Sequence, residues 1–310
     1  MESTEMASKL KLYIQELRAP FFTGSVVPVA LGSVIAWSKA DAFHWGWFLL
    51  TLIGAMALHA GANVANDYFD HKSGADDVNV EYVRPFTGGS RMIQKGLLTP
   101  REVIAESLAL YALAAAIGVY LIIVRGPVIL LLGAIGAFSG FFYTAPPFKF
   151  VHRGVGEIFI GLNFGVLITL GAYFVQAGAL SWEPVAASIQ VAILITAILY
   201  INEFQDYSAD KSVGKNHWVV RLGRQRAVYG FGAMMALVYL SIIVAAFASI
   251  ITPWALIALL TMPLAIKAFL VTRNNFGDSQ ALVPANAATI ATHLTTGVAL
   301  IAAYVLQRLV

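Results

Sequence analysis

Four polar side chains share one helical face at the end of a long apolar run, and their types suit metal and phosphate chemistry. At about 100° per residue they fall within an arc of roughly 100°. They are Asn63, Asn66, Asp67 and Asp70. Two carboxylates and two amides are costly beside hydrocarbon unless a partner compensates for their desolvation. Mg²⁺ is such a partner, because it prefers oxygen ligands and commonly carries a substrate phosphate.

Basic residues follow this acidic face within a short distance along the chain. Arg84, Arg91 and Lys95 lie in the 25 residues after Asp70. Cationic side chains next to a carboxylate-bound metal are the groups that hold a diphosphate. The composition of this stretch therefore predicts a diphosphate site, with Arg91 and Lys95 as the leading contacts and Arg84 next.

A second stretch repeats the arrangement later in the chain. Asn202, Asp206 and Asp210 are spaced by four residues and climb one helical face, again at the end of an apolar run. The basic residues that follow are Lys211, Lys215, Arg221, Arg224 and Arg226. Two acidic helix ends, each trailed by a basic loop, predict two metal ions held on one diphosphate. We assign Lys211 to the diphosphate and the three arginines to lipid headgroups.

The motifs resemble those of the UbiA superfamily of intramembrane prenyltransferases. The resemblance rests on NDYFD, GGSRMIQKG, a second DxxxD and GK followed by VVRLG, with ELRAPFF and YTAPPFKF as further matches. The GGSRMIQKG segment is most similar to the 1,4-dihydroxy-2-naphthoate polyprenyltransferases of menaquinone synthesis. This resemblance implies an enzyme that transfers a polyprenyl group from its diphosphate to an aromatic acceptor, with Mg²⁺ as cofactor. It also raises the expectation that Arg18, otherwise an anchor before the first span, reaches the diphosphate.

The chemistry assigns a role to each candidate residue. An allylic diphosphate ionises when the charge on its leaving group is neutralised, and the carbocation must be shielded from water. One metal is expected on Asn66, Asp67 and Asp70, and a second on Asp206 and Asp210. Asn63 and Asn202 are expected to bind these groups or to orient the aspartates. Tyr143 is the aromatic residue we expect to face the cation, although packing or an aromatic belt would also explain it.

Composition frames the fold. The chain is 59% hydrophobic and 12% charged, which is typical of a polytopic all-α membrane protein. We predict one domain over 1–310, with a polar leader at 1–17 and motif loops at 68–100 and 205–226. Nine helices, as two four-helix halves plus one, are expected to enclose a central cavity. The predicted spans are 20–37, 45–67, 101–124, 127–143, 155–177, 183–204, 227–250, 253–271 and 286–306.

The basic residues predict the orientation. Of the 20 lysines and arginines, 17 fall on the side of the N-terminus and both motif loops, which predicts that this side is cytoplasmic. The net charge of +3 is explained by this topology and by the diphosphate, so nucleic acid is not an expected partner. The expected partners are a polyprenyl diphosphate, an aromatic acceptor and the lipid bilayer. Nothing in the residues indicates an oligomeric state.

Two alternatives stay open at this stage. The same chemistry could use 4-hydroxybenzoate, homogentisate or geranylgeranylglyceryl phosphate as the acceptor. A transporter could use paired acidic helix ends for a coupling ion, although such groups are expected near the membrane midplane rather than at span ends. His59 lies four residues before Asn63 on the same face and could line the cavity, whereas a lone histidine is more often structural.

Overall fold

The computed structural model describes residues 2–310, with side chains from Lys9 onward, and this part of the chain contains helices and no strands. The short elements are α1 (Glu2–Glu16), η1 (Ala19–Phe22), α4 (Ala75–Val78), η2 (Phe150–Arg153) and α10 (Trp218–Leu222). The long elements are α2 (Thr23–Ala40), α3 (Trp45–Ser73), α5 (Pro100–Arg125), α6 (Val128–Phe141), the run α7 (Gly156–Ile160), η3 (Gly161–Leu167) and α8 (Ile168–Ala177), α9 (Trp182–Ser212), α11 (Arg224–Phe247), the run η4 (Pro253–Thr261) and α12 (Met262–Asn275), and α13 (Val283–Leu309).

The long elements follow the predicted spans in number and order. Within the described residues, eight helices are long and apolar enough to cross a membrane, and α6 is a shorter apolar helix. The predicted fourth span, 127–143, is therefore too long, because α6 has 14 residues and ends at Phe141. At 1.5 Å per residue it rises about 21 Å, less than the hydrocarbon thickness. The all-α prediction with roughly nine spans is confirmed.

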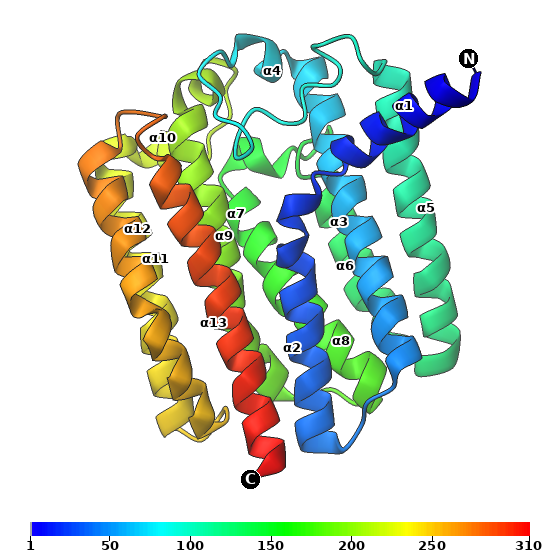
Figure 1. Cartoon of the computed structure of the whole chain (residues 1–310), viewed down its shortest axis with the longest axis vertical. Helices are drawn as coiled ribbons and strands as arrows, with labels where there is room; N and C mark the ends of the chain where they lie inside the picture. The colour runs from blue at the N-terminus through cyan, green and yellow to red at the C-terminus, as the bar shows by residue number, and fades with distance from the viewer. Residues whose placement is uncertain (1) are drawn as a thin grey trace.

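Both motifs lie inside helices rather than in loops. α3 continues to Ser73 and ends at Gly74, whose φ of +78° suits a residue without a Cβ. α9 likewise continues to Ser212. The predicted loops therefore begin too early, and the connecting segments are 74–99 and 213–223. These segments lie with α1, α4 and α10 at one end of the bundle, and the C-terminus lies at the other (Figure 1).

Local signals in the sequence fix where two of the long helices, α5 and α9, begin. Thr99 and Glu102 form a reciprocal capping box at the start of α5, where Pro100 occupies the first turn. The Ser181 side chain accepts a hydrogen bond from the Glu183 backbone N–H and caps α9. The two helices begin at Pro100 and Trp182, each one residue before the predicted start of its span.

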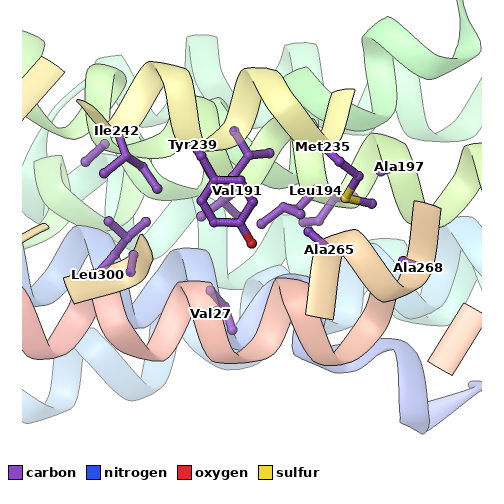
Figure 2. Packing of buried hydrophobic residues seen from close by; sticks show 14 of the residues in the cluster. Val27, Val191, Leu194, Ala197, Met235, Tyr239, Ile242, Ala265, Ala268 and Leu300 are labelled. Atoms are coloured by element: carbon purple, nitrogen blue, oxygen red, sulfur yellow. The ribbon is translucent and has the colours of Figure 1, made fainter. Parts of the chain in front are cut away.

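The packed core and the lipid-facing surface lie in different parts of the molecule. Buried apolar side chains from α2, α9, α11, α12 and α13 form the main cluster, of which Val191, Tyr239 and Leu300 are members (Figure 2). In α5, by contrast, only 11% of the most apolar window is buried. Because the protein buries so little of this apolar helix, lipid must cover the rest of its surface. One face of α9 thus joins the core, which leaves its other face for the site.

Small residues allow the helices to approach closely. A Cβ on Gly32 of α2 would collide with the backbone carbonyl oxygen of Thr169 on α8. This close contact between small-residue faces is a usual source of stability between membrane helices. It holds α2 against α8 on one wall of the cavity described below.

Candidate active site

A cavity of about 970 Å³ lies between α2, α3, α5, α6, η3, α8 and α9. Its polar end is formed by the motif-bearing ends of α3 and α9. Its remaining walls are mostly apolar, and include Leu58, Ile117, Leu132, Ile168 and Leu199. A volume near the upper end of the usual range for small-molecule sites, about 300–1,000 Å³, can hold a long apolar ligand with one polar group.

The first acidic helix end presents three of its four polar residues to the cavity. Asn63, Asn66 and Asp70 line it, and the Asn66 amide donates to Asp70 Oδ2 at 3.3 Å. Asp67 is buried beside the cavity. Its Oδ2 accepts the backbone N–H of Ser90 at 2.9 Å, and its Oδ1 lies 3.9 Å from the Arg18 guanidinium. Three of the four predicted residues therefore face the cavity, and Asp67 faces the loop that carries Ser90.

The Gly-Gly-Ser-Arg segment has a structural explanation in this contact. Gly88 and Gly89 have φ values of +80° and +62°, a region that residues with a side chain rarely adopt. A Cβ on Gly89 would lie 2.5 Å from Asp67 Oδ1. The two glycines thus bring the loop backbone against Asp67, so that the Ser90 N–H can donate to its carboxylate. The Gly88–Ser90 part of the GGSRMIQKG motif therefore positions Asp67.

The second acidic helix end faces the same cavity. Asn202, Asp206 and Asp210 all line it. Asp206 Oδ1 accepts a hydrogen bond from the Asn79 amide at 2.7 Å, and Asn202 Oδ1 accepts one from Asn286 at 2.8 Å. These donors orient the oxygens of both residues. The predicted approach of the two acidic helices is present in the fold.

Lys215 joins the two helix ends. Its Nζ lies 3.0 Å from Asp70 Oδ2 and 3.3 Å from Asp210 Oδ1, and the residue is buried. Burial alone would lower the pKa of Lys215, but the carboxylates of Asp210 and Asp70 outweigh this and raise it above its ordinary value. A permanent positive charge therefore sits between carboxylates of both motifs, at the polar end of the cavity.

A second basic residue, His217, contacts the Asp210 carboxylate at the oxygen that Lys215 does not contact. His217 Nε2 lies 3.3 Å from Asp210 Oδ2, and its Nδ1 lies 3.3 Å from Glu203 Oε2. Burial opposes the charged form, yet Glu203 and Asp210 raise the pKa of His217 to about 10. Glu157, Glu203 and His217 also have ligand atoms within 4.8 Å of one another, which makes them a second set able to hold a metal. His217 thus lies between Glu203 and Asp210, within 3.3 Å of a carboxylate oxygen of each.

The predicted diphosphate contacts occupy different environments. Arg18 lines the cavity. Arg84 donates to the Ser90 carbonyl oxygen, and Arg91 donates to the carbonyl oxygens of Asp76 and Asn79. Both arginines thus bind the loop backbone.

The two predicted lysine contacts are exposed. Lys95 lies on the first loop, and Lys211 lies over the ring of Tyr207 at 5.6 Å. The structure brings neither of them to the cavity lining. Their contact with diphosphate stays a prediction.

Tyr143 and Asp76 also belong to the cavity. Tyr143, the aromatic residue predicted to face the cation, lines it. Asp76 also lines it and accepts a hydrogen bond from Gln94 at 3.1 Å. Burial, and then the negative charges of Asp70 and Asp67, raise the pKa of Asp76 to about 8.

Lys215, His217 and Asn79 were not assigned to the site from the sequence. A signal for Lys215 existed, because it follows Asp210 by five residues within the GK motif. His217 is two residues further along. No periodicity links Asn79 to Asp206, since 127 residues separate them. Only the folded loop brings that pair together.

Comparison with known proteins agrees with this geometry. The sequence profile of the UbiA prenyltransferase family matches residues 25–291 of this chain. The chain is 29% identical over 273 residues to a 1,4-dihydroxy-2-naphthoate octaprenyltransferase of Mycobacterium tuberculosis, covering 88% of this chain and 89% of the relative. It is 28% identical over 256 residues to the enzyme of the same name in Bacillus subtilis, covering 82% and 79%.

Solved structures share the fold. A UbiA homolog from Archaeoglobus fulgidus bound to DMAPP and Mg²⁺ superposes with a TM-score of 0.62 at 19% identity, covering 94% of this chain and 99% of that one. A digeranylgeranylglyceryl phosphate synthase gives a TM-score of 0.65 at 18% identity, covering 96% and 99%. The family match spans most of the chain, including both acidic motifs and most of the cavity lining. The chain therefore belongs to the UbiA prenyltransferase family, and it is an integral-membrane enzyme that transfers prenyl groups.

Proposed function

We propose that this enzyme transfers a polyprenyl group from its diphosphate to 1,4-dihydroxy-2-naphthoate in a Mg²⁺-dependent reaction, giving a demethylmenaquinol. The observation that carries the proposal is the pairing of two acidic helix ends through Lys215 at the polar end of a largely apolar cavity. A diphosphate needs the charged end, and a polyprenyl tail needs the apolar walls. The relatives named for naphthoate transfer support the choice of acceptor.

The donor set fits Mg²⁺. Carboxylate and amide oxygens from both helices line one end of the cavity, and these are hard ligands. Asp67 Oδ1 is buried without a hydrogen-bond partner among the described residues, which leaves it able to bind a cation. The residues that would hold metal are Asn66, Asp67, Asp70, Asp206 and Asp210. When bound, Mg²⁺ neutralises charge that develops on the departing diphosphate.

The chain's own groups perform the remaining tasks. Lys215 and Arg18 carry positive charge at the polar end of the cavity and would stabilise the leaving group further. The C1–O bond of the donor breaks and its electron pair leaves with the diphosphate. The ring carbon that carries the carboxylate then bonds to C1, and the carboxylate leaves as CO₂ while the electron pair of its C–C bond returns to the ring. The Tyr143 ring face and the apolar walls would exclude water from C1 meanwhile.

The position of the acidic groups favours this enzyme over an ion-coupled transporter. They lie at the ends of α3 and α9, beside the connecting segments at one end of the bundle (Figure 1). A coupling-ion site is expected near the midplane, in broken helices. The placement of 17 of the 20 basic residues on the motif side supports a cytoplasmic position for this end.

The orientation can be tested directly because the chain has no cysteine. Single cysteines at Lys211 and at Trp182, which is 83% exposed at the other end of α9, serve as reporters. In intact cells, a membrane-impermeant maleimide should label the cysteine at position 182 and spare the one at 211. The reverse pattern would place the motif loops outside.

A panel of acceptors tests the proposed reaction. Purified enzyme receives Mg²⁺ and a polyprenyl diphosphate with naphthoate, 4-hydroxybenzoate, homogentisate or geranylgeranylglyceryl phosphate in separate reactions. We expect the fastest product formation with the naphthoate, and none after chelation of the metal. Faster transfer to any other acceptor would overturn the choice of substrate and leave the family unaffected.

A further inference from the structure

We propose that His59 binds the aromatic acceptor, with its Nε2 hydrogen-bonded to a polar group on the acceptor ring. The inference rests on the proposed function and adds a specificity-determining residue to it. His59 lies on α3, one helical turn before Asn63, and both residues line the same cavity. One turn corresponds to about 5–6 Å along the helix axis. His59 is thus deeper in the bundle than the acidic groups.

The imidazole is held in one orientation by three neighbours. Ser25 Oγ on α2 lies 2.9 Å from His59 Nδ1. The ring also packs edge-on against Phe164 of η3, at 4.5 Å between centroids, and against Phe22, at 5.5 Å. A side chain fixed by a hydrogen bond and two aromatic contacts is preorganised for recognition, because binding need not order it further.

The second ring nitrogen is left for a ligand. His59 Nε2 has no hydrogen-bond partner among the described residues, and it is not among the fully enclosed atoms without a partner. It therefore keeps accessible surface, and the ring is part of the cavity lining. His293 on α13 provides the contrast: it is fully buried, both of its nitrogens are enclosed, and it does not line the cavity.

The reaction geometry places the acceptor at this depth. The attacking ring carbon must come within about 3–3.5 Å of C1. Because the diphosphate and its metals would occupy the polar end, the space left beside C1 for the acceptor is the deeper part of the cavity. There His59 is accompanied by Asn163 on η3, whose Oδ1 accepts a hydrogen bond from Ser139 at 2.9 Å. A hydroxylated ring would find polar partners among otherwise apolar walls.

The segment that carries Phe164 and Asn163 is itself unusual. Residues Gly161–Leu167 form a π-helical turn within the span, and such turns occur frequently at functional sites. A Cβ on Gly161 would come within 2.6 Å of the Thr196 hydroxyl on α9, so the turn packs closely against that helix. The local geometry that directs Phe164 onto His59 is therefore supported by α9.

The test separates acceptor binding from diphosphate binding. Initial rates of the full-length enzyme in nanodiscs are measured while 1,4-dihydroxy-2-naphthoate is varied at saturating prenyl diphosphate. The prenyl diphosphate is then varied at saturating 1,4-dihydroxy-2-naphthoate. His59→Phe keeps an aromatic ring and removes the hydrogen bond. We expect it to raise KM for the acceptor about tenfold, with KM for the prenyl diphosphate changed less than about twofold. His59→Gln should recover part of the loss, and Ser25→Ala should produce a smaller rise of the same kind.

A control variant and a binding measurement make the outcomes distinct. His293→Gln changes a buried histidine away from the cavity and should leave both KM values unchanged. Equilibrium binding of the naphthoate without prenyl diphosphate is measured alongside. If the wild type binds and prenylates no aromatic acceptor, the proposed function fails. If the wild type does both, and His59→Phe and His59→Gln match it in acceptor KM and affinity, only the inference about His59 is overturned. A rise confined to the KM of the prenyl diphosphate would overturn it too.

Discussion

Each acidic helix end is followed by a segment rich in glycine and basic residues, 74–99 after α3 and 213–223 after α9. In the first segment, Arg84 and Arg91 donate to backbone carbonyl oxygens of the segment itself. In the second, Lys215 and His217 contact the carboxylates of the motifs directly. Similar compositions therefore serve different purposes. The first segment uses its cations to hold its own shape over Asp67, and the second supplies charge to the site.

This difference between the two segments predicts that mutations will reduce turnover to different degrees. Groups whose atoms meet the diphosphate or its metals should affect turnover most. Cations of the second segment should come next, and cations of the first segment should act through loop structure. The predictions below run in that order, and each pairs a variant with a residue of similar type in a different environment.

Loss of a motif aspartate should give the largest effect. Asp206→Ala removes a carboxylate that lines the cavity, and we expect turnover to fall by about 1,000-fold or more. Asp67→Ala should be similarly severe, because Asp67 is a proposed metal ligand and also accepts the Ser90 N–H of the loop that covers it. Mg²⁺-dependent product formation is measured in purified, folded protein. Asp77→Ala is the control, since Asp77 is exposed on the first segment. Substantial turnover in either motif variant would refute the two-metal assignment.

Lys215 of the second segment is compared with Lys211, an exposed lysine in the last turn of α9. Lys215→Ala leaves Asp70 and Asp210 without their shared counter-charge, so we expect about a 100-fold loss of turnover and weaker binding of prenyl diphosphate. Lys211→Ala should change turnover less than about threefold, because an exposed cation contributes little. Initial rates and diphosphate titrations give both values. Equal effects of the two variants would show that both lysines reach the diphosphate.

Arg91 and Lys95 test the first segment. Arg91→Ala removes donors to the Asp76 and Asn79 carbonyl oxygens, so we expect faster proteolysis of the segment and about a tenfold loss of turnover. Lys95→Ala should leave proteolysis unchanged because Lys95 is exposed. Limited proteolysis with and without prenyl diphosphate is compared with kinetics. A rise in KM for the diphosphate in Lys95→Ala would mean that this segment closes over the bound substrate.

The sequence was sufficient to predict the all-α fold and the helical faces on which the acidic residues lie. Long apolar runs fix the spans, and the spacing of Asn202, Asp206 and Asp210 fixes a common face, because both depend only on local periodicity. The shortness of α6 was not predictable, since Phe142 and Tyr143 continue the apolar run beyond the last helical residue.

The partners of the basic residues could not be read from composition. An arginine that binds a carbonyl oxygen and one that binds a diphosphate follow the same sequence pattern. What separates Arg91 from Lys215 is how the chain folds back after each helix, for example at the Gly88–Gly89 turn that brings Ser90 to Asp67. The Ser90–Asp67 contact joins residues 23 positions apart and the Lys215–Asp70 contact joins residues 145 positions apart, where helical periodicity carries no information.

The smallest expected effect concerns stability and lies where α1 meets the first motif. Glu16 ends α1, is fully buried, and has no hydrogen-bond partner for either carboxylate oxygen among the described residues. Burial, and then the negative charge of Asp67, raise the pKa of Glu16 to about 8. The folded protein therefore holds a proton that the unfolded chain loses near pH 4.5. Stability from this group is complete below that pH and is lost as the pH rises through about 8.

Glu16→Gln should remove this dependence, because glutamine stays neutral at every pH. The thermal midpoint of the variant in detergent should match that of the wild type near pH 4.5 and exceed it by about 5 °C at pH 9. Glu81→Gln, a change at an exposed position of the first segment, should shift the midpoint equally little at both values of pH. A constant difference between Glu16→Gln and wild type from pH 4.5 to 9 would show that Glu16 is already ionised in the folded protein. In that case Arg18, the cation whose charge lowers the pKa of Glu16, would compensate this buried carboxylate as Lys215 compensates Asp70 and Asp210, and the contrast between the two acidic helix ends would narrow.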